Sequence, residues 1–151
     1  MKNPVGSYRR EFMFPEEWKG RDVMLRFNGA GHGYYVWVNG EFVGYAEDSY
    51  LPSEFDITDK LRPGKNNIAV RVYRFTSGSF LECQDYWRMT GITRDVYLWS
   101  APKTRIDDFF FRTTALKDGN SAAESALTVA VSGTKMKKAT LEAQLLDGSR
   151  V

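Results

Sequence analysis

Residues 34–45 read Tyr34-Tyr35-Val36-Trp37-Val38-Asn39-Gly40-Glu41-Phe42-Val43-Gly44-Tyr45. Two runs rich in aromatic and β-branched residues flank the dipeptide Asn39-Gly40. Both residues of this dipeptide tolerate the positive φ of a tight two-residue turn, so the pattern is the strongest short-range signal for a β-hairpin. We therefore expect two antiparallel strands joined at Asn39-Gly40.

Short alternating segments continue in both directions from this hairpin. Ile68, Val70 and Val72 fall on one face of such a segment. No part of the chain keeps a sustained helical period. A single helical turn is expected at residues 56–61, with Asp56 or Thr58 as its cap. Many short strands at even spacing are typical of a sandwich or a barrel. The other expected strands are residues 8–14, 23–28 and 95–99.

The chain has 151 residues, enough for one domain or one and a fraction. Residues 100–103 look like a boundary, because Pro102 cannot donate a hydrogen bond within a central strand. Three more strands are expected beyond it, whereas a complete sandwich uses about seven. We therefore predict a first domain at residues 1–102 and a second, truncated domain at residues 103–151. The three expected strands are residues 106–113, 126–132 and 139–146.

Composition excludes several kinds of partner. The net charge is +2 and no basic stripe appears, which argues against nucleic-acid binding. No run of about 18 apolar residues is present, so the sequence predicts no membrane-spanning helix. The aromatic share of 15% suits a sheet core, the favoured interpretation, and it also suits carbohydrate binding, where flat apolar rings meet C–H faces.

Self-contained catalysis has little support in the sequence. His32 is the only histidine and Cys83 the only cysteine, which leaves few nucleophiles, bases or zinc ligands. A retaining glycosidase needs two carboxyl groups about 5 Å apart. The acidic pairs Glu82/Asp85 and Glu54/Asp56 are better explained as solvated side chains. No helix follows Gly29, Gly31 and Gly33, so we interpret them as turn glycines and not as a phosphate-binding loop.

Residues 79–96 form a long segment without strand alternation until Asp95. Such a segment is either disordered or functional, and its aromatic residues Tyr86 and Trp87 argue against disorder. Arg88 and Arg94 lie near Asp85 and Asp95 in sequence, which predicts paired charges that hold the loop.

Three blocks carry a resemblance to a known family. They are residues 3–8 (Asn3-Pro4-Val5-Gly6-Ser7-Tyr8), residues 38–56, which include Leu51-Pro52-Ser53-Glu54-Phe55-Asp56, and residues 81–96, which include Gln84-Asp85-Tyr86-Trp87-Arg88. In these blocks the sequence resembles the N-terminal domain of glycoside hydrolase family 2, and within it the β-galactosidases. The resemblance covers residues 3–116 and fades towards Val151.

This resemblance implies a fold and a role. The fold would be all-β, with a jelly-roll (galactose-binding-domain-like) sandwich followed by a truncated immunoglobulin-like sandwich. The chain would be the non-catalytic sugar-binding region of a β-galactosidase that hydrolyses terminal β-D-galactosides, and it would complete the active site of a catalytic barrel that the chain lacks. It would need no cofactor of its own.

The resemblance also implies site residues. Asn3 and Asp85 would contact the β-galactoside inside the barrel, and Asp85 would also be a metal ligand, because hard cations prefer oxygen. Sodium is the expected metal of the full enzyme and magnesium a second candidate. Cys83 departs from the family pattern, which has an acidic residue there. The family also has strands before Asn3, so we expect open sheet edges and self-association through them.

Two alternatives remain open. The chain could be a free-standing carbohydrate-binding module or lectin, which would carry an exposed aromatic platform and complete strands. It could also be a structural scaffold between domains that makes no contact with sugar.

Overall fold

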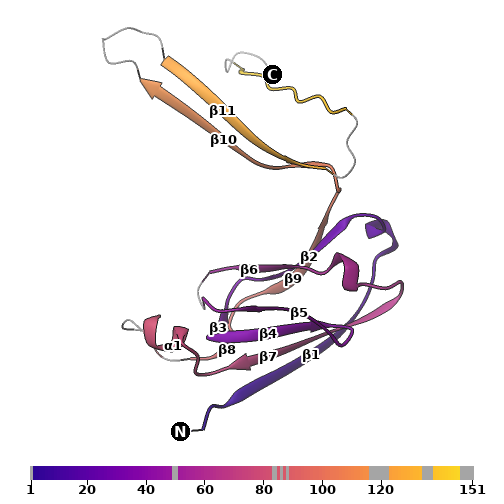
Figure 1. Cartoon of the computed structure of the whole chain (residues 1–151), viewed down its shortest axis with the longest axis vertical. Coiled ribbons are helices and arrows are strands. Elements are labelled where there is room, and N and C mark those ends of the chain that lie inside the picture. Colours follow the sequence, from indigo (N-terminus) through magenta and orange to yellow (C-terminus); the bar gives the residue numbers. More distant parts are fainter. Residues whose placement is uncertain are drawn as a thin grey trace. The chain divides into compact units, whose positions relative to one another are not determined.

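A computed structural model describes residues 2–48, 51–82, 85, 87, 89–115, 123–133 and 138–146. The chain divides into two compact units, Met1–Pro102 and Lys103–Val151 (Figure 1). Each unit is described by itself.

The first unit is an all-β sandwich, as predicted. One sheet has the strand order β1-β7-β4-β5 and the other has the order β6-β2-β9, and all pairings are antiparallel. A short ribbon of β3 and β8 and three single-turn helices are the other elements among the described residues of this unit. The elements are β1 (Val5–Met13), η1 (Glu16–Trp18), β2 (Asp22–Phe27), β3 (Ala30–Gly31), β4 (Gly33–Val38), β5 (Glu41–Ala46), β6 (Ser53–Asp56), η2 (Thr58–Lys60), β7 (Lys65–Tyr73), α1 (Gly78–Leu81), β8 (Gly91–Ile92) and β9 (Val96–Ala101).

The predicted hairpin is β4–β5. Asn39 and Gly40 have φ of 53° and 85°, the left-handed conformation that such a turn requires. Val38 pairs with Glu41 directly across the turn. The expected helical turn is η2, where Asp56 Oδ1 accepts a hydrogen bond of 2.9 Å from the Thr58 N–H.

The core lies between the two sheets. Alternate residues of β2 and β4 point into it, as the period of a strand requires. Phe27 of β2 contacts Tyr34 of β4, with ring centroids 4.9 Å apart. The buried core residues are Val23, Leu25, Phe27, Ala30, Tyr34, Val36, Val38, Ile57, Val70 and Val72.

Two of the supposed turn glycines lie in strands, so that interpretation is wrong for Gly31 in β3 and Gly33 in β4. Packing explains the glycine at position 33. A Cβ atom there would lie 2.5 Å from the Tyr45 hydroxyl and 2.7 Å from Cγ2 of Thr76, too close for any larger residue. The absent side chain lets Tyr45 lie across β4.

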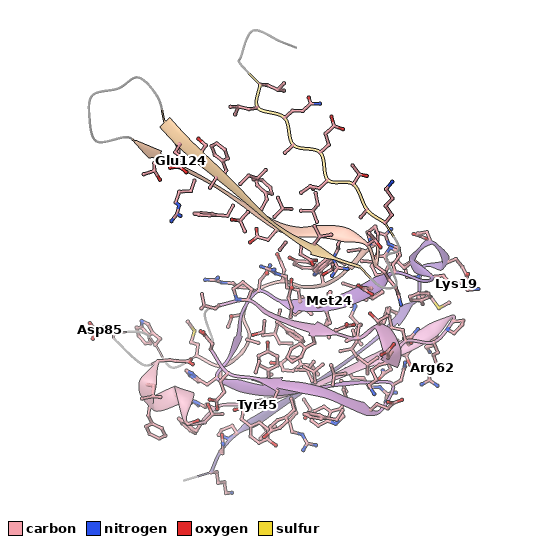
Figure 2. All side chains as sticks on the ribbon, turned by 45° about the horizontal axis from the view of Figure 1, so that its top comes forward. Lys19, Met24, Tyr45, Arg62, Asp85 and Glu124 are labelled. Carbon is pink, nitrogen blue, oxygen red and sulfur yellow. The ribbon has the colours of Figure 1, made fainter. Side chains whose placement is uncertain are left out.

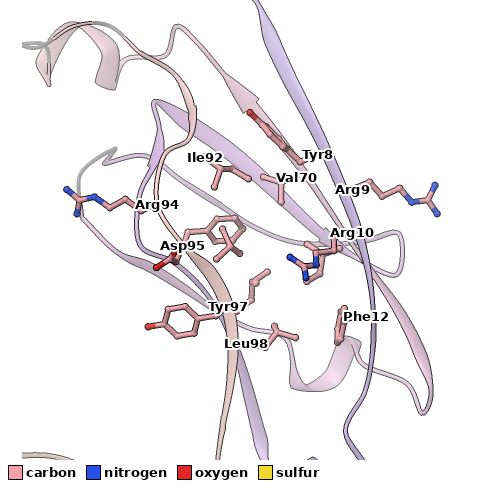
Figure 3. A pocket seen from close by; sticks show the side chains of 14 residues that line it. Tyr8, Arg9, Arg10, Phe12, Val70, Ile92, Arg94, Asp95, Tyr97 and Leu98 are labelled. Carbon is pink, nitrogen blue, oxygen red and sulfur yellow. The ribbon is translucent and has the colours of Figure 1, made fainter.

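The two sides of the sandwich differ. On one side β5 meets β6, where the ring of Phe55 lies against Gly44. On the other side β1 and β9 flank a cavity of about 650 Å³, with Phe27 and Val70 among its lining residues. Figure 3 shows Tyr8 of β1 and Leu98 of β9 across this opening. This side of the sandwich lies between the edge strands of the two sheets, β1 and β9.

In the described part of the second unit, β10 (Arg105–Ala115) and β11 (Ala123–Ser132) form an antiparallel pair. The strand predicted at residues 139–146 is wrong, because those residues form no strand. Alternation of apolar residues makes a strand only where a partner strand supplies backbone hydrogen bonds. Leu145 pairs with no strand among the described residues, and it is 87% exposed.

Candidate functional site

Asn3 lies two residues before β1 and is hydrogen-bonded to the chain before α1. Its Nδ2 donates to the Phe75 carbonyl at 2.7 Å, and its Oδ1 accepts from the Phe75 N–H at 3.0 Å. The side-chain amide thus imitates a backbone peptide and extends the β1–β7 pairing beyond Val5 and Tyr73. Each amide atom keeps one further bonding position, so Asn3 can still contact a ligand.

The segment around α1 is anchored at two side chains. The buried Ser79 hydroxyl donates to the Arg74 carbonyl at 3.1 Å and accepts from the Thr76 N–H at 2.9 Å. Glu82, directly after α1, accepts a hydrogen bond of 3.0 Å from the Asp48 N–H. Its other carboxylate oxygen lies 3.8 Å from Nδ1 of the buried His32. His32, the only histidine of the sequence, therefore helps to hold this loop.

Asp85 follows this anchored segment in an exposed turn. Figure 2 shows it beyond α1, at the end of the sandwich where the N-terminus lies in Figure 1. Asn3 and Asp85 therefore lie at the same end of the first unit, because Asn3 is bonded to Phe75 just before α1. The predicted partner Arg88 lies outside the described residues, as do Cys83, Gln84 and Tyr86.

A metal site can be tested against the same geometry. Within the described ranges, no group of three or more His, Cys, Asp or Glu side chains could hold a metal ion. The exposed Asp85 carboxylate is an oxygen donor that suits sodium or magnesium. The described residues thus fit one ligand of such a site and do not form a complete one.

A polar network that the sequence analysis missed borders this end. The Tyr45 hydroxyl donates to Glu47, whose two oxygens also accept from the Ser77 hydroxyl at 3.1 and 3.2 Å. Partial burial and the neighbouring Glu47 carboxylate raise the pKa of Tyr45, so the phenol stays protonated and remains a donor. Tyr45 and Glu47 are two residues apart, so in an extended chain their side chains point to the same side. This spacing is the sequence pattern that could have revealed the network.

Aromatic side chains gather on the outer face of the sheet β1-β7-β4-β5. Tyr35 contacts rings on both neighbouring strands, at centroid distances of 4.6 Å from Tyr45 and 5.8 Å from Tyr73. Trp37 and Phe42 extend the cluster along β4 and β5, with their ring centroids 5.9 Å apart. Composition alone favoured burial in the core, whereas these five rings lie on the opposite face from the core.

Among the helices that the structure describes, none is long and apolar enough to cross a membrane.

Comparisons with known proteins agree on a family. The sequence profile described as "Glycosyl hydrolases family 2, sugar binding domain" matches residues 1–102. A beta-galactosidase of Priestia megaterium is 55% identical over 112 residues, which are 74% of this chain and 11% of that protein. A beta-galactosidase of Clostridium acetobutylicum is 50% identical over 124 residues, 82% of this chain and 14% of that protein. The chain thus spans a small part of the length of these relatives.

Solved structures share the fold. A beta-glycosidase from Bacteroides vulgatus superposes with a TM-score of 0.68 at 28% identity, over 87% of this chain and 16% of that one. A beta-glucuronidase of Bifidobacterium dentium reaches a TM-score of 0.73 at 24% identity, over 86% of this chain and 27% of that one. The second likeness concerns the fold alone.

Proposed function

Because the chain belongs to glycoside hydrolase family 2, as its resemblance to that family predicted, we propose that it is the sugar-binding region of a β-galactosidase and completes the active site of a catalytic barrel. The relatives named above as beta-galactosidases support the substrate. The observation that carries the proposal is the double hydrogen bond between Asn3 and Phe75. It joins Asn3, one expected sugar contact, to the segment that leads to Asp85, the other expected contact.

In this proposal the two residues have different tasks. The exposed Asp85 carboxylate accepts hydrogen bonds from galactosyl hydroxyls and supplies one ligand to the sodium ion. Asn3 offers the remaining N–H of its amide to the same substrate. The catalytic carboxylates belong to the barrel, so the isolated chain would not hydrolyse a galactoside. The ion would neutralise charge and orient the hydroxyls beside Asp85.

The Asp85→Ala variant of the full-length enzyme tests this role. Each lost charge-assisted hydrogen bond costs about 1.5–3 kcal/mol, so kcat/KM for a nitrophenyl β-galactoside should fall roughly 10-fold to 100-fold. Thermal stability should hardly change, because Asp85 is exposed. Asp59→Ala, at an exposed position in η2, is the matched control and should keep wild-type kinetics. A wild-type kcat/KM for Asp85→Ala would refute the assigned role.

We also propose that the isolated chain self-associates. Phe109, Phe111, Leu127 and Val129 share one face of the β10–β11 pair by their register, and the first three are exposed. An exposed apolar face of this kind, next to strand edges that pair with no other described strand, favours pairing with another copy. Light scattering on the purified chain should therefore give a mass above that of a monomer, increasing with concentration.

Two variants check which face is responsible. Phe111→Glu should shift the chain towards monomer, because a carboxylate would be desolvated in the contact. Thr128→Glu adds the same charge on the opposite face, across from Phe110, and should leave the mass unchanged. A monomer mass for the unmodified chain at every concentration would contradict the proposal.

A further inference from the structure

The outer face of the sheet β1-β7-β4-β5 has a chemical character that the proposed function does not use. Tyr35, Phe42 and Tyr45 are 37%, 55% and 40% exposed, although such rings are usually covered. They lie on adjacent strands β4 and β5, with Tyr35 6.2 Å from Phe42 and 4.6 Å from Tyr45 between ring centroids. These adjacent exposed rings make this face a candidate interaction site.

Polar groups at both ends of the patch narrow the choice of ligand. The Arg71 guanidinium lies 5.8 Å from the ring centroid of Trp37, where it offers several N–H donors. At the other end the Glu47 carboxylate accepts from Tyr45 and Ser77 and is a strong acceptor for a further hydroxyl. Ring faces between a cationic donor and an anionic acceptor match a pyranose, which has apolar C–H faces and a rim of hydroxyls.

The patch is continuous with the end of the unit that carries Asn3. Tyr45 lies across Gly33 with its hydroxyl beside Thr76, the residue after Phe75. Ser77 then joins Glu47 to the start of α1. A saccharide on the patch would therefore lie beside the same end of the sandwich as Asn3.

We propose that this face binds a neutral, β-linked galacto-oligosaccharide, with pyranose rings stacked on Tyr35, Phe42 and Tyr45 and their hydroxyls bonded to Arg71 and Glu47. The choice of galactose rests on the proposed function, whereas the stacking surface does not. A glycan held here would supply a second contact for oligomeric substrates, beyond the terminal galactose. The aromatic platform expected of a carbohydrate-binding module is thus present on a chain of this family.

Calorimetric titration of the full 151-residue chain with β-1,4-galactotetraose tests the inference. The unmodified chain should bind, and Tyr35→Ala and Phe42→Ala should each weaken binding roughly fivefold to tenfold. Tyr97→Ala is the matched control, because Tyr97 is a similarly exposed tyrosine on β9 in the other sheet. Circular dichroism of each variant should match that of the unmodified chain, which separates lost binding from lost folding.

Other outcomes would overturn the inference. No heat of binding for the unmodified chain would do so, and so would equal losses in Tyr97→Ala and Tyr35→Ala. Suppression of self-association by Phe42→Ala without any saccharide binding would assign the face to a protein partner instead. Loss of tetraose binding in Asp85→Ala, with binding kept in Tyr35→Ala and Phe42→Ala, would assign the sugar to the loop, and the proposed function would then stand without this surface.

Discussion

Replacing Phe27 by alanine is expected to lower the free energy of unfolding of the first unit by about 3–5 kcal/mol. The side chain is 0% exposed. Its ring bridges the two sheets, 4.9 Å from the Tyr34 ring and 6.0 Å from the Phe55 ring between centroids. Alanine would remove these contacts and leave a void that the sheets on either side cannot fill without moving.

Denaturant unfolding followed by tryptophan fluorescence measures this loss. The four tryptophans, Trp18, Trp37, Trp87 and Trp99, all lie in the first unit, so the signal reports on that unit alone. Phe42→Ala is the control, because it makes the same change on the outer face and should cost less than about 1 kcal/mol. Equal losses for the two variants would show that Phe27 does not close the core.

The predictable part of the fold was encoded by local patterns. Asn39-Gly40 specified the hairpin because the required φ values are a property of those two residues. The alternation in β7 placed Ile68, Val70 and Val72 on one face for a similarly local reason, the period of two along a strand, and Val70 and Val72 lie in the core with Ile68 packed against it. Both predictions are confirmed, since neither depends on knowing which strand comes next in the sheet.

The errors concern contacts between distant parts of the chain. Residues 139–146 alternate as a strand does, but alternation does not reveal whether a partner strand is present. Gly33 is required by the Tyr45 hydroxyl, twelve residues away and on the neighbouring strand, and no turn is involved. Strand pairing and close approach across a sheet follow from tertiary structure, which local sequence patterns do not contain.

The candidate site shows the same division. Asn3 and Asp85 came from the resemblance to the family, and no local pattern would have linked them. The link is the double hydrogen bond from the Asn3 amide to Phe75, across 72 positions of the sequence. The aromatic face was accessible in principle, because alternation along β4 places Tyr34 and Tyr35 on opposite faces. Composition does not distinguish the two tyrosines. The interpretation that the aromatic residues lie in the sheet core is therefore correct for Tyr34 and wrong for Tyr35.

Asn66 connects the hairpin to the rest of the sheet through a buried polar network. The side chain is 1% exposed and makes four hydrogen bonds. Its Oδ1 accepts from Asn39 Nδ2 at 2.7 Å and from the Arg62 N–H at 3.0 Å. Its Nδ2 donates to the carbonyls of Arg62 at 2.8 Å and Gly64 at 3.0 Å. One amide thus satisfies two turns, the β4–β5 turn and the turn before β7.

Asn66→Ala should therefore destabilise the first unit by about 3 kcal/mol, because it leaves several partly buried polar groups without partners. Asn66→Asp should be about as damaging, since a carboxylate cannot donate to the carbonyls of Arg62 and Gly64. Asn67→Ala is the matched control, because among the described residues the hydrogen bond of the Asn67 side chain is a long one, 3.5 Å to the Arg10 carbonyl. It should change the free energy of unfolding by less than about 1 kcal/mol in the same fluorescence experiment. A cost for Asn66→Ala no larger than that of the control would mean that water replaces the amide, and that the two turns are held by their backbones alone.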